Sequence, residues 1–158
     1  MANLNFDPVV GEEVHTPGHY GGPFKIVAVY STSRSGLGTV DLRQIGNDHF
    51  LPGVPWSMLR FDETRNVRRA IEWLRENPVV PFPEYLLDYH VEARDDHQGN
   101  PAFYIRFIVE PDDQPSPEKI KGLNRFLDSV STMLLSLGLD RWPYVQVSEK
   151  RSLLDVAS

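Results

Sequence analysis

The second half of the chain contains two different spacings of hydrophobic residues. Apolar and polar residues alternate over 85–94 and again over 102–109, which is typical of two half-buried strands. The short turn between these segments predicts an antiparallel hairpin, with Val91 opposite Ile105 and His90 opposite Arg106. After residue 116 the apolar residues recur every three or four positions instead, and this spacing predicts a helix.

Local signals give that helix its ends. Ser116 can cap the first turn and Pro117 suits the first helical position, while Gly138 is a good left-handed stop. The predicted buried stripe consists of Ile120, Leu123, Leu127, Val130, Leu134 and Leu137. A closing strand over 142–147 follows. Residues 84–149 are therefore predicted to form a β-β-α-β unit, with one long amphipathic helix on an antiparallel sheet and a tail over 150–158.

The first half reads as short strands separated by glycine- and proline-containing turns. Strands are predicted over 9–15, 24–30, 39–43 and 49–51, followed by a tight helical turn that places Trp56 and Leu59 in a core. This order and spacing over 9–61 resembles a small SH3-like barrel of the KOW or Tudor kind, and the resemblance implies a groove that could hold a ligand.

A helix is predicted after this barrel, because Asp62 can cap it and its apolar residues recur at helical spacing. Those residues are Val67, Ala70, Ile71 and Leu74. Three prolines then fall within 78–83 and stop the helix. The fold class is therefore α+β, with a barrel plus helix over 1–77, a proline-rich connector over 78–83 that packs through its apolar residues, and the β-β-α-β unit.

Composition restricts the function without specifying it. The chain has 158 residues, no cysteine and a formal net charge of -6. Residues 78–158 hold 8 Lys/Arg and 13 Asp/Glu, so most of the acidity lies there. This charge disfavours nucleic acid as the partner. We expect a cytoplasmic protein without disulfides, thiolate metal sites or a membrane span, because neither a signal peptide nor a long apolar segment is present.

The polar face of the predicted hairpin holds the candidates for catalysis. Asp88, His90, Glu92 and Arg106 would project from one side of the sheet, and they include acid, base and cationic groups. An ordinary solvated sheet face would also carry such residues, and this interpretation is favoured.

Two further groups are candidates for binding. Arg65, Arg68 and Arg69 leave the apolar stripe of the first helix and could hold phosphate groups or dock onto the acidic second unit of this or another chain. An ordinary solvated helix face would carry such residues too, and this interpretation is the default. Tyr104, Trp142 and Tyr144 would lie on the exposed side of the second sheet, where aromatic residues stack bases or fill a protein interface. Acidic Asp88 and Glu92 on the same side favour the protein interface, including one between two copies of the chain.

Two weaker patterns complete the candidates. His15 and His19 flank a Pro-Gly turn that excludes a shared helix face, so no metal site is predicted there. The loop over 33–38 contains Arg34 and two glycines, but it precedes a strand and lacks the phosphate-loop lysine. No cofactor fingerprint is present.

These observations favour a non-enzymatic binding or adaptor protein that acts on a protein partner, for instance as an immunity or antitoxin protein. Two alternatives remain open. One is a small hydrolase or nucleotide-acting enzyme that uses the polar hairpin face. The other is a nucleic-acid-binding accessory factor that uses the barrel and the arginine-rich helix.

Overall fold

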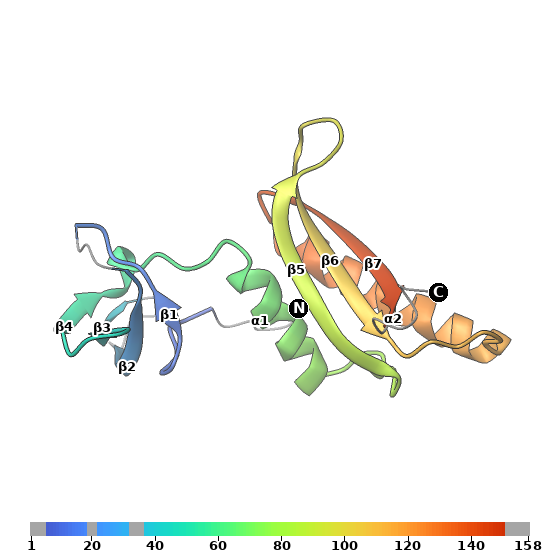
Figure 1. The fold of residues 1–158 in the computed structure, drawn as a ribbon, viewed down its shortest axis with the longest axis horizontal. Coiled ribbons are helices and arrows are strands. Elements are labelled where there is room, and N and C mark those ends of the chain that lie inside the picture. The colour runs from blue at the N-terminus through green and yellow to red at the C-terminus, as the bar shows by residue number, and fades with distance from the viewer. Residues whose placement is uncertain (1–5, 19–21, 32–36, 151–158) are drawn as a thin grey trace. The chain divides into compact units, whose positions relative to one another are not determined.

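The computed structural model describes residues 6–18, 22–31 and 37–150, and it has the predicted α+β class (Figure 1). The chain forms two compact units, Met1–Arg65 and Asn66–Ser158. Each unit has its own sheet, four-stranded and antiparallel in the first and three-stranded and mixed in the second. Helix α1 (Arg65–Glu76) groups with the second unit, although its sequence position suggested the first.

The strands of the first unit follow one another in space as they do in sequence. They are β1 (Glu13–Val14), β2 (Phe24–Ser31), β3 (Gly38–Gln44) and β4 (Phe50–Pro55). The strands predicted over 24–30 and 39–43 are confirmed. The strand predicted over 9–15 is wrong in length, because Gly11 has a φ of 96° and turns the chain, so only two residues remain in the ladder.

One small core lies under this sheet. Its buried residues are Val14, Phe24, Ile26, Val40, Leu42 and Leu59, and Trp56 packs against them. The predicted helical turn is confirmed as the 3-10 helix η1 (Trp56–Met58). The described residues form no closed barrel. A single bridge joins His15 to Arg60, and the backbone N–H of each donates to the other's carbonyl at 2.8 Å. The SH3-like arrangement stays a prediction.

The second sheet has the order β5-β6-β7, formed by β5 (Leu86–Asp95), β6 (Pro101–Val109) and β7 (Trp142–Glu149). The predicted hairpin register is confirmed, since Val91 pairs with Ile105 and His90 with Arg106. The predicted antiparallel sheet is wrong, because β7 runs parallel to β6. The intervening helix α2 (Pro117–Ser136) carries the chain back to the end where β6 starts, so the next strand repeats its direction.

The predicted start of α2 and the predicted stripe of α1 are confirmed. Ser116 caps α2 by accepting the backbone N–H of Lys119 at 3.1 Å, and Gly138 follows the helix with a φ of 65°. The predicted apolar stripe of α1 is also confirmed, because Val67, Ala70, Ile71 and Leu74 are all buried. Neither α1 nor α2 is long and apolar enough to cross a membrane.

The covered face of the second sheet is centred on an aromatic cluster that the sequence pattern missed. Phe126 of α2 is fully buried and contacts Phe107 and Phe82 edge to face, with ring centroids 5.0 and 4.7 Å away. Phe82 thus packs the proline-rich connector onto this core, whereas Val79 of the same connector is 83% exposed, so the predicted packing of its apolar residues holds only in part. Ile120 was placed in the buried stripe wrongly and is 47% exposed. Leu87 is exposed too, because an irregularity in pairing between Leu86 and Asp88 shifts its side chain off the apolar face.

Candidate functional site

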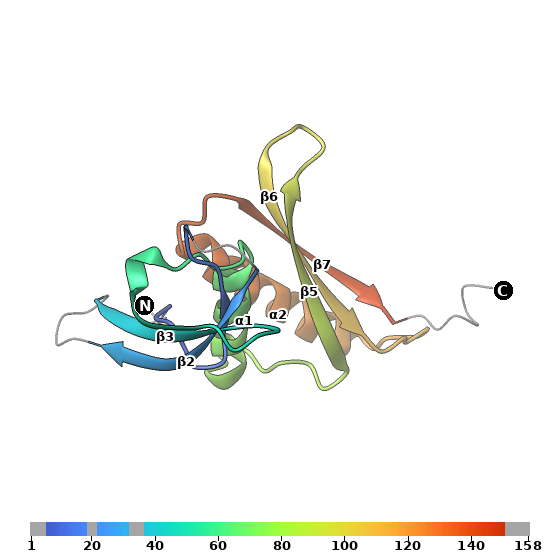
Figure 2. The same cartoon turned by 60° about the vertical axis from the view of Figure 1, so that its left-hand side comes forward.

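The side of the second sheet opposite α2 is covered by no described helix, and here it is called the open face (Figure 2). Strand register places three rows of residues across it. The rows are Glu92–Tyr104–Tyr144, His90–Arg106–Gln146 and Arg94–Ala102–Trp142. The structure therefore brings the predicted catalytic residues and the predicted aromatic residues onto one surface.

Aromatic side chains dominate one end of the open face. The rings of Tyr104 and Tyr144 are stacked, with centroids 5.2 Å apart and an angle of 20° between their planes. The guanidinium carbon of Arg94 lies 3.8 Å from the centroid of Tyr104, a cation–π distance. Trp142 lies two residues from Tyr144 on the same strand and is 56% exposed. This end therefore presents three aromatic side chains, with the Arg94 guanidinium over one of them.

A hydrogen-bonded turn fixes the position of Tyr144. Its hydroxyl donates to Asp96 Oδ2 at 3.0 Å, while Asp96 Oδ1 accepts the backbone N–H groups of Gln98 and Asn100 at 2.9 Å each. The Asn100 N–H bond is the largest cause that lowers the pKa of Asp96, and the Gln98 and Tyr144 bonds lower it further. The bond to Asp96 raises the pKa of the Tyr144 hydroxyl. Tyr144 is therefore oriented before any ligand binds.

This contact predicts a measurable titration. The Asp96 carboxyl should have a pKa below its ordinary value of 3.8 in carbon-detected NMR, and Tyr144→Phe should raise that pKa part of the way back. A lowered carboxyl pKa stabilises the fold above the ordinary value, and this stability is lost as pH falls through the lower value. Tyr104→Phe, which loses a hydroxyl on the same face, should leave the pKa unchanged. A wild-type Asp96 pKa at or above 3.8 would contradict the geometry.

The catalytic candidates do not form an acid–base pair. The Glu92 carboxylate lies 3.2 Å from Arg94 Nε, and Asp88 Oδ1 accepts the backbone N–H of Tyr89 at 2.8 Å. His90 is exposed and is separated from Glu92 by two strand positions, roughly 7 Å. Among the described residues no hydrogen bond joins His90 to Asp88, Glu92 or Arg106. The open face thus carries charged, solvent-exposed side chains, and their catalytic role stays a prediction.

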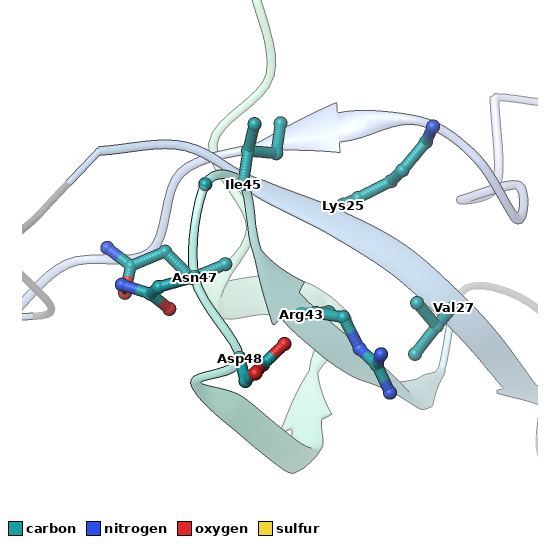
Figure 3. A pocket seen from close by; sticks show the side chains of 8 residues that line it. Lys25, Val27, Arg43, Ile45, Asn47 and Asp48 are labelled. Atoms are coloured by element: carbon teal, nitrogen blue, oxygen red, sulfur yellow. Dashed lines mark hydrogen bonds between the residues drawn. The ribbon is translucent and has the colours of Figure 1, made fainter.

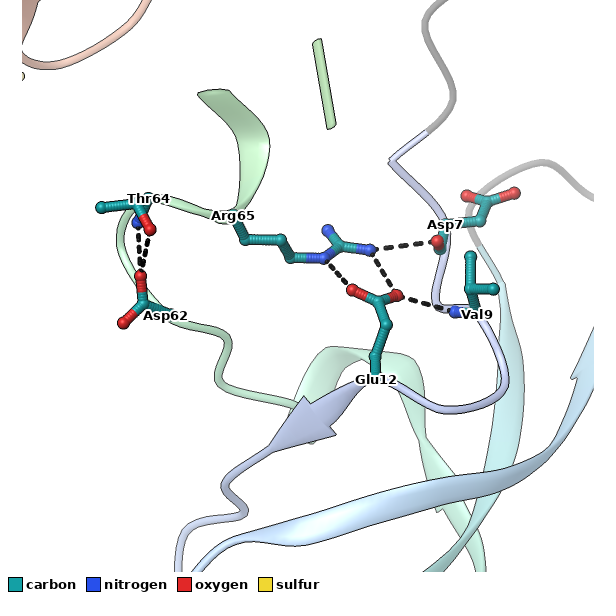
Figure 4. Close-up of polar contacts among 6 residues, drawn as sticks. All are labelled: Asp7, Val9, Glu12, Asp62, Thr64 and Arg65. Atoms are coloured by element: carbon teal, nitrogen blue, oxygen red, sulfur yellow. Dashed lines mark hydrogen bonds and ion pairs between the residues drawn. The ribbon is translucent and has the colours of Figure 1, made fainter. Parts of the chain in front are cut away.

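The arginine group predicted for binding is partly occupied by internal contacts (Figure 4). Arg65 contacts both carboxylate oxygens of Glu12, with Nε 2.7 Å from Oε2 and Nη2 3.1 Å from Oε1. Its Nη2 also donates to the Asp7 carbonyl at 3.0 Å, and its guanidinium lies over the ring of Phe61. This side chain holds the amino-terminal segment of the first unit.

The other two arginines of the group lie in the second unit. Arg68 Nη2 donates to the carbonyl of Val91 at 3.2 Å, so α1 contacts the outer backbone of β5. Arg69 is half-buried and also has an interaction partner. The three side chains thus do not form one free cationic patch.

The first unit contains a pocket that sequence analysis did not predict (Figure 3). It has a volume of about 580 Å³ and is lined by Lys25, Val27, Arg43, Gln44, Ile45, Gly46, Asn47 and Asp48. Alternation along two adjacent strands was the available signal, since Lys25 and Val27 of β2 and Arg43 of β3 point outward and Ile45 follows β3. These side chains could be placed beside one another only once the register of β2 and β3 was known.

The remaining candidates gain no support. His15 is exposed beside the bridge to Arg60, whereas His19 and most of the loop over 33–38 lie outside the described residues. Within the described ranges, no group of three His, Asp or Glu residues could hold a metal ion.

The chain was compared with models of protein families, with curated proteins and with solved structures. None matches it. Its function therefore has to be inferred from its own residues, foremost from the open face.

Proposed function

We propose that this chain is a non-enzymatic binding protein whose open face recognises another protein. The observation that carries the proposal is the stacked pair Tyr104–Tyr144 beside the exposed Trp142. Tyrosine, tryptophan and arginine contribute most of the binding energy in many protein interfaces. Because Tyr144 is held by Asp96 and Tyr104 by Arg94, little side-chain entropy remains to be lost on binding.

Charge supports a basic partner. The net charge of -6 and the acidic excess of residues 78–158 attract a cationic protein over distance and raise its rate of association. An acidic binding protein of this size suits an immunity or antitoxin role, in which it neutralises a basic protein. A second copy of the chain is the other protein that could occupy the face.

Nucleic-acid binding and catalysis have less support as functions of this chain. A nucleic acid stacked on Tyr104 and Tyr144 would bring its phosphates near Asp88 and Glu92, which repel them. An enzyme would need His90 to contact a second catalytic group, and Glu92 is instead paired with Arg94.

The fold of the first unit and the location are part of the same proposal. Four antiparallel strands in sequence order, the 3-10 turn after β4 and the His15–Arg60 bridge support an SH3-like arrangement of a binding module. The lack of cysteine supports a cytoplasmic location.

The experiment uses a double variant, Tyr104→Ala with Trp142→Ala. A partner captured from cells of the source organism is identified and purified, and its Kd for the full chain is measured by calorimetry. The double variant should weaken binding by at least about 30-fold, the effect of losing roughly 2 kcal/mol at a hot spot. Leu135→Ala serves as the control, because Leu135 is 50% exposed on α2, away from the open face. Equal affinity for wild type and double variant would refute the proposal.

Sedimentation separates a foreign partner from a second copy. If the wild-type chain is dimeric at micromolar concentration and the double variant monomeric, the partner is the chain itself. Tighter binding to an oligonucleotide than to any protein, with a steep dependence on salt, would favour the nucleic-acid alternative instead.

A further inference from the structure

Two cations lie directly opposite each other on the outer side of the first sheet. Lys25 of β2 and Arg43 of β3 are partners in the antiparallel ladder, and both are exposed. Like charges in this position repel, and such pairs destabilise a sheet. Among the described residues neither side chain makes an ion pair, although Glu13 and Asp48 lie at neighbouring positions. An anion bound between the two cations would reduce their repulsion.

The pocket around this pair is already formed. Val27 and Ile45 lie beside the two cations and are exposed aliphatic side chains (Figure 3). The turn that closes the pocket is held locally, because Asn47 Nδ2 donates to Gln44 Oε1 at 2.8 Å and Asn47 Oδ1 accepts the backbone N–H of His49 at 2.8 Å. The site therefore combines positive charge, apolar surface and a fixed wall.

We propose that this pocket binds a protein segment in which an acidic residue is flanked by apolar ones. The carboxylate would lie between Lys25 and Arg43, where the guanidinium can give two parallel hydrogen bonds. The apolar side chains on either side of the acidic residue would contact Val27 and Ile45, which flank the two cations. This is a second binding site, carried by residues of the first unit alone and independent of the open face.

Charge at the margins of the pocket selects this ligand over a nucleic acid. Asp48 lines the pocket, and Glu13 of β1 is the ladder partner of Lys25 on its other side. A phosphate backbone carries one negative charge for every nucleotide and would bring further charges against these carboxylates. A peptide with only one or two carboxylates would instead bring uncharged residues close to Asp48 and Glu13.

The experiment is an NMR titration of the full ¹⁵N-labelled chain with the blocked peptide acetyl-Val-Glu-Val-Glu-Val-amide. Amide shifts should move at Lys25, Val27, Arg43 and Ile45, and the glutamine analogue of the peptide should bind at least tenfold more weakly. K25E/R43E should also bind the acidic peptide at least tenfold more weakly, and it should gain affinity for the lysine analogue. R125A, which removes one exposed cation from α2, should stay within twofold of wild type. If K25E/R43E fails to fold, K25Q/R43Q takes its place.

Two results would overturn the proposal. One is equal binding of the glutamate and glutamine peptides, since the carboxylate would then be irrelevant. The other is tighter binding of octathymidylate than of the acidic peptide at the same shifted amides, which would assign the pocket to a phosphate backbone.

Discussion

Replacing Phe126 by alanine is expected to lower the free energy of unfolding of the second unit by about 3–5 kcal/mol. The ring is fully buried and touches Phe107 on the sheet and Phe82 on the connector. Its removal takes away apolar contact with both, and edge-to-face ring pairs contribute beyond their buried area. Because domain stability is commonly only 5–15 kcal/mol in total, the variant should be largely unfolded well below the wild-type transition temperature.

Hydrogen exchange at the amides of β6 is the direct measurement, because it reports the stability of the second unit separately from the first. Leu135→Ala on the same helix is the matched control, with an expected change of less than about 1 kcal/mol since Leu135 is half exposed. If Phe126→Ala left β6 as protected as in wild type, the aromatic cluster could not be the centre of this core.

Most of the second unit was predictable because its signals are local. Alternation fixes which residues of a strand share a face, and a hairpin with a short turn then fixes the register, so His90 and Arg106 were correctly paired. The α1 stripe was equally clear. On each of these elements, the spacing of apolar residues was enough to identify the element and its buried face.

The errors arose where tertiary packing decided between locally equal choices. The stripe of α2 was assigned from its aliphatic residues, and Phe126 beside them was left out, although a ring fills the space over Phe107 better. The direction of β7 depends on the end of the sheet at which the chain leaves α2, and residues 142–147 carry no local signal for that direction. The availability of functional groups was harder to predict. Nothing in the local sequence indicates that Arg65 pairs with Glu12, because the two residues are distant in sequence.

The two proposed binding sites lie on different units, and this makes them separable in experiments. The open face is formed by residues of β5, β6 and β7, and the cationic pocket by residues within 25–48. A variant at Trp142 should leave binding of the acidic peptide unchanged, and K25E/R43E should leave the affinity of the open face for its partner unchanged. An adaptor that joins two proteins requires this independence.

Replacing Gly38 by alanine is expected to destabilise the first unit by roughly 2–3 kcal/mol, the upper part of the range for overpacking a fixed site. A Cβ atom at this position would overlap the carbonyl oxygen of Tyr30 and lie 2.6 Å from Cε2 of Trp56. Neither group can move freely. Tyr30 belongs to the paired strand β2, and the Trp56 indole is held by a hydrogen bond from Nε1 to the Thr39 carbonyl at 3.2 Å. The strain must therefore open the end of the β2–β3 hairpin or displace Trp56 from the core.

Gly122→Ala is the matched comparison for this substitution, with the opposite expected sign. Gly122 lies within α2, and an added Cβ atom there would meet no atom within 4 Å. Alanine should stabilise the second unit by about 0.5–1 kcal/mol, because it restricts the unfolded chain and favours the helix. Hydrogen exchange at β3 amides should record the loss in Gly38→Ala, and exchange at α2 amides the gain in Gly122→Ala. A Gly38→Ala variant as stable as wild type would mean that Trp56 does not pack against β3 as described.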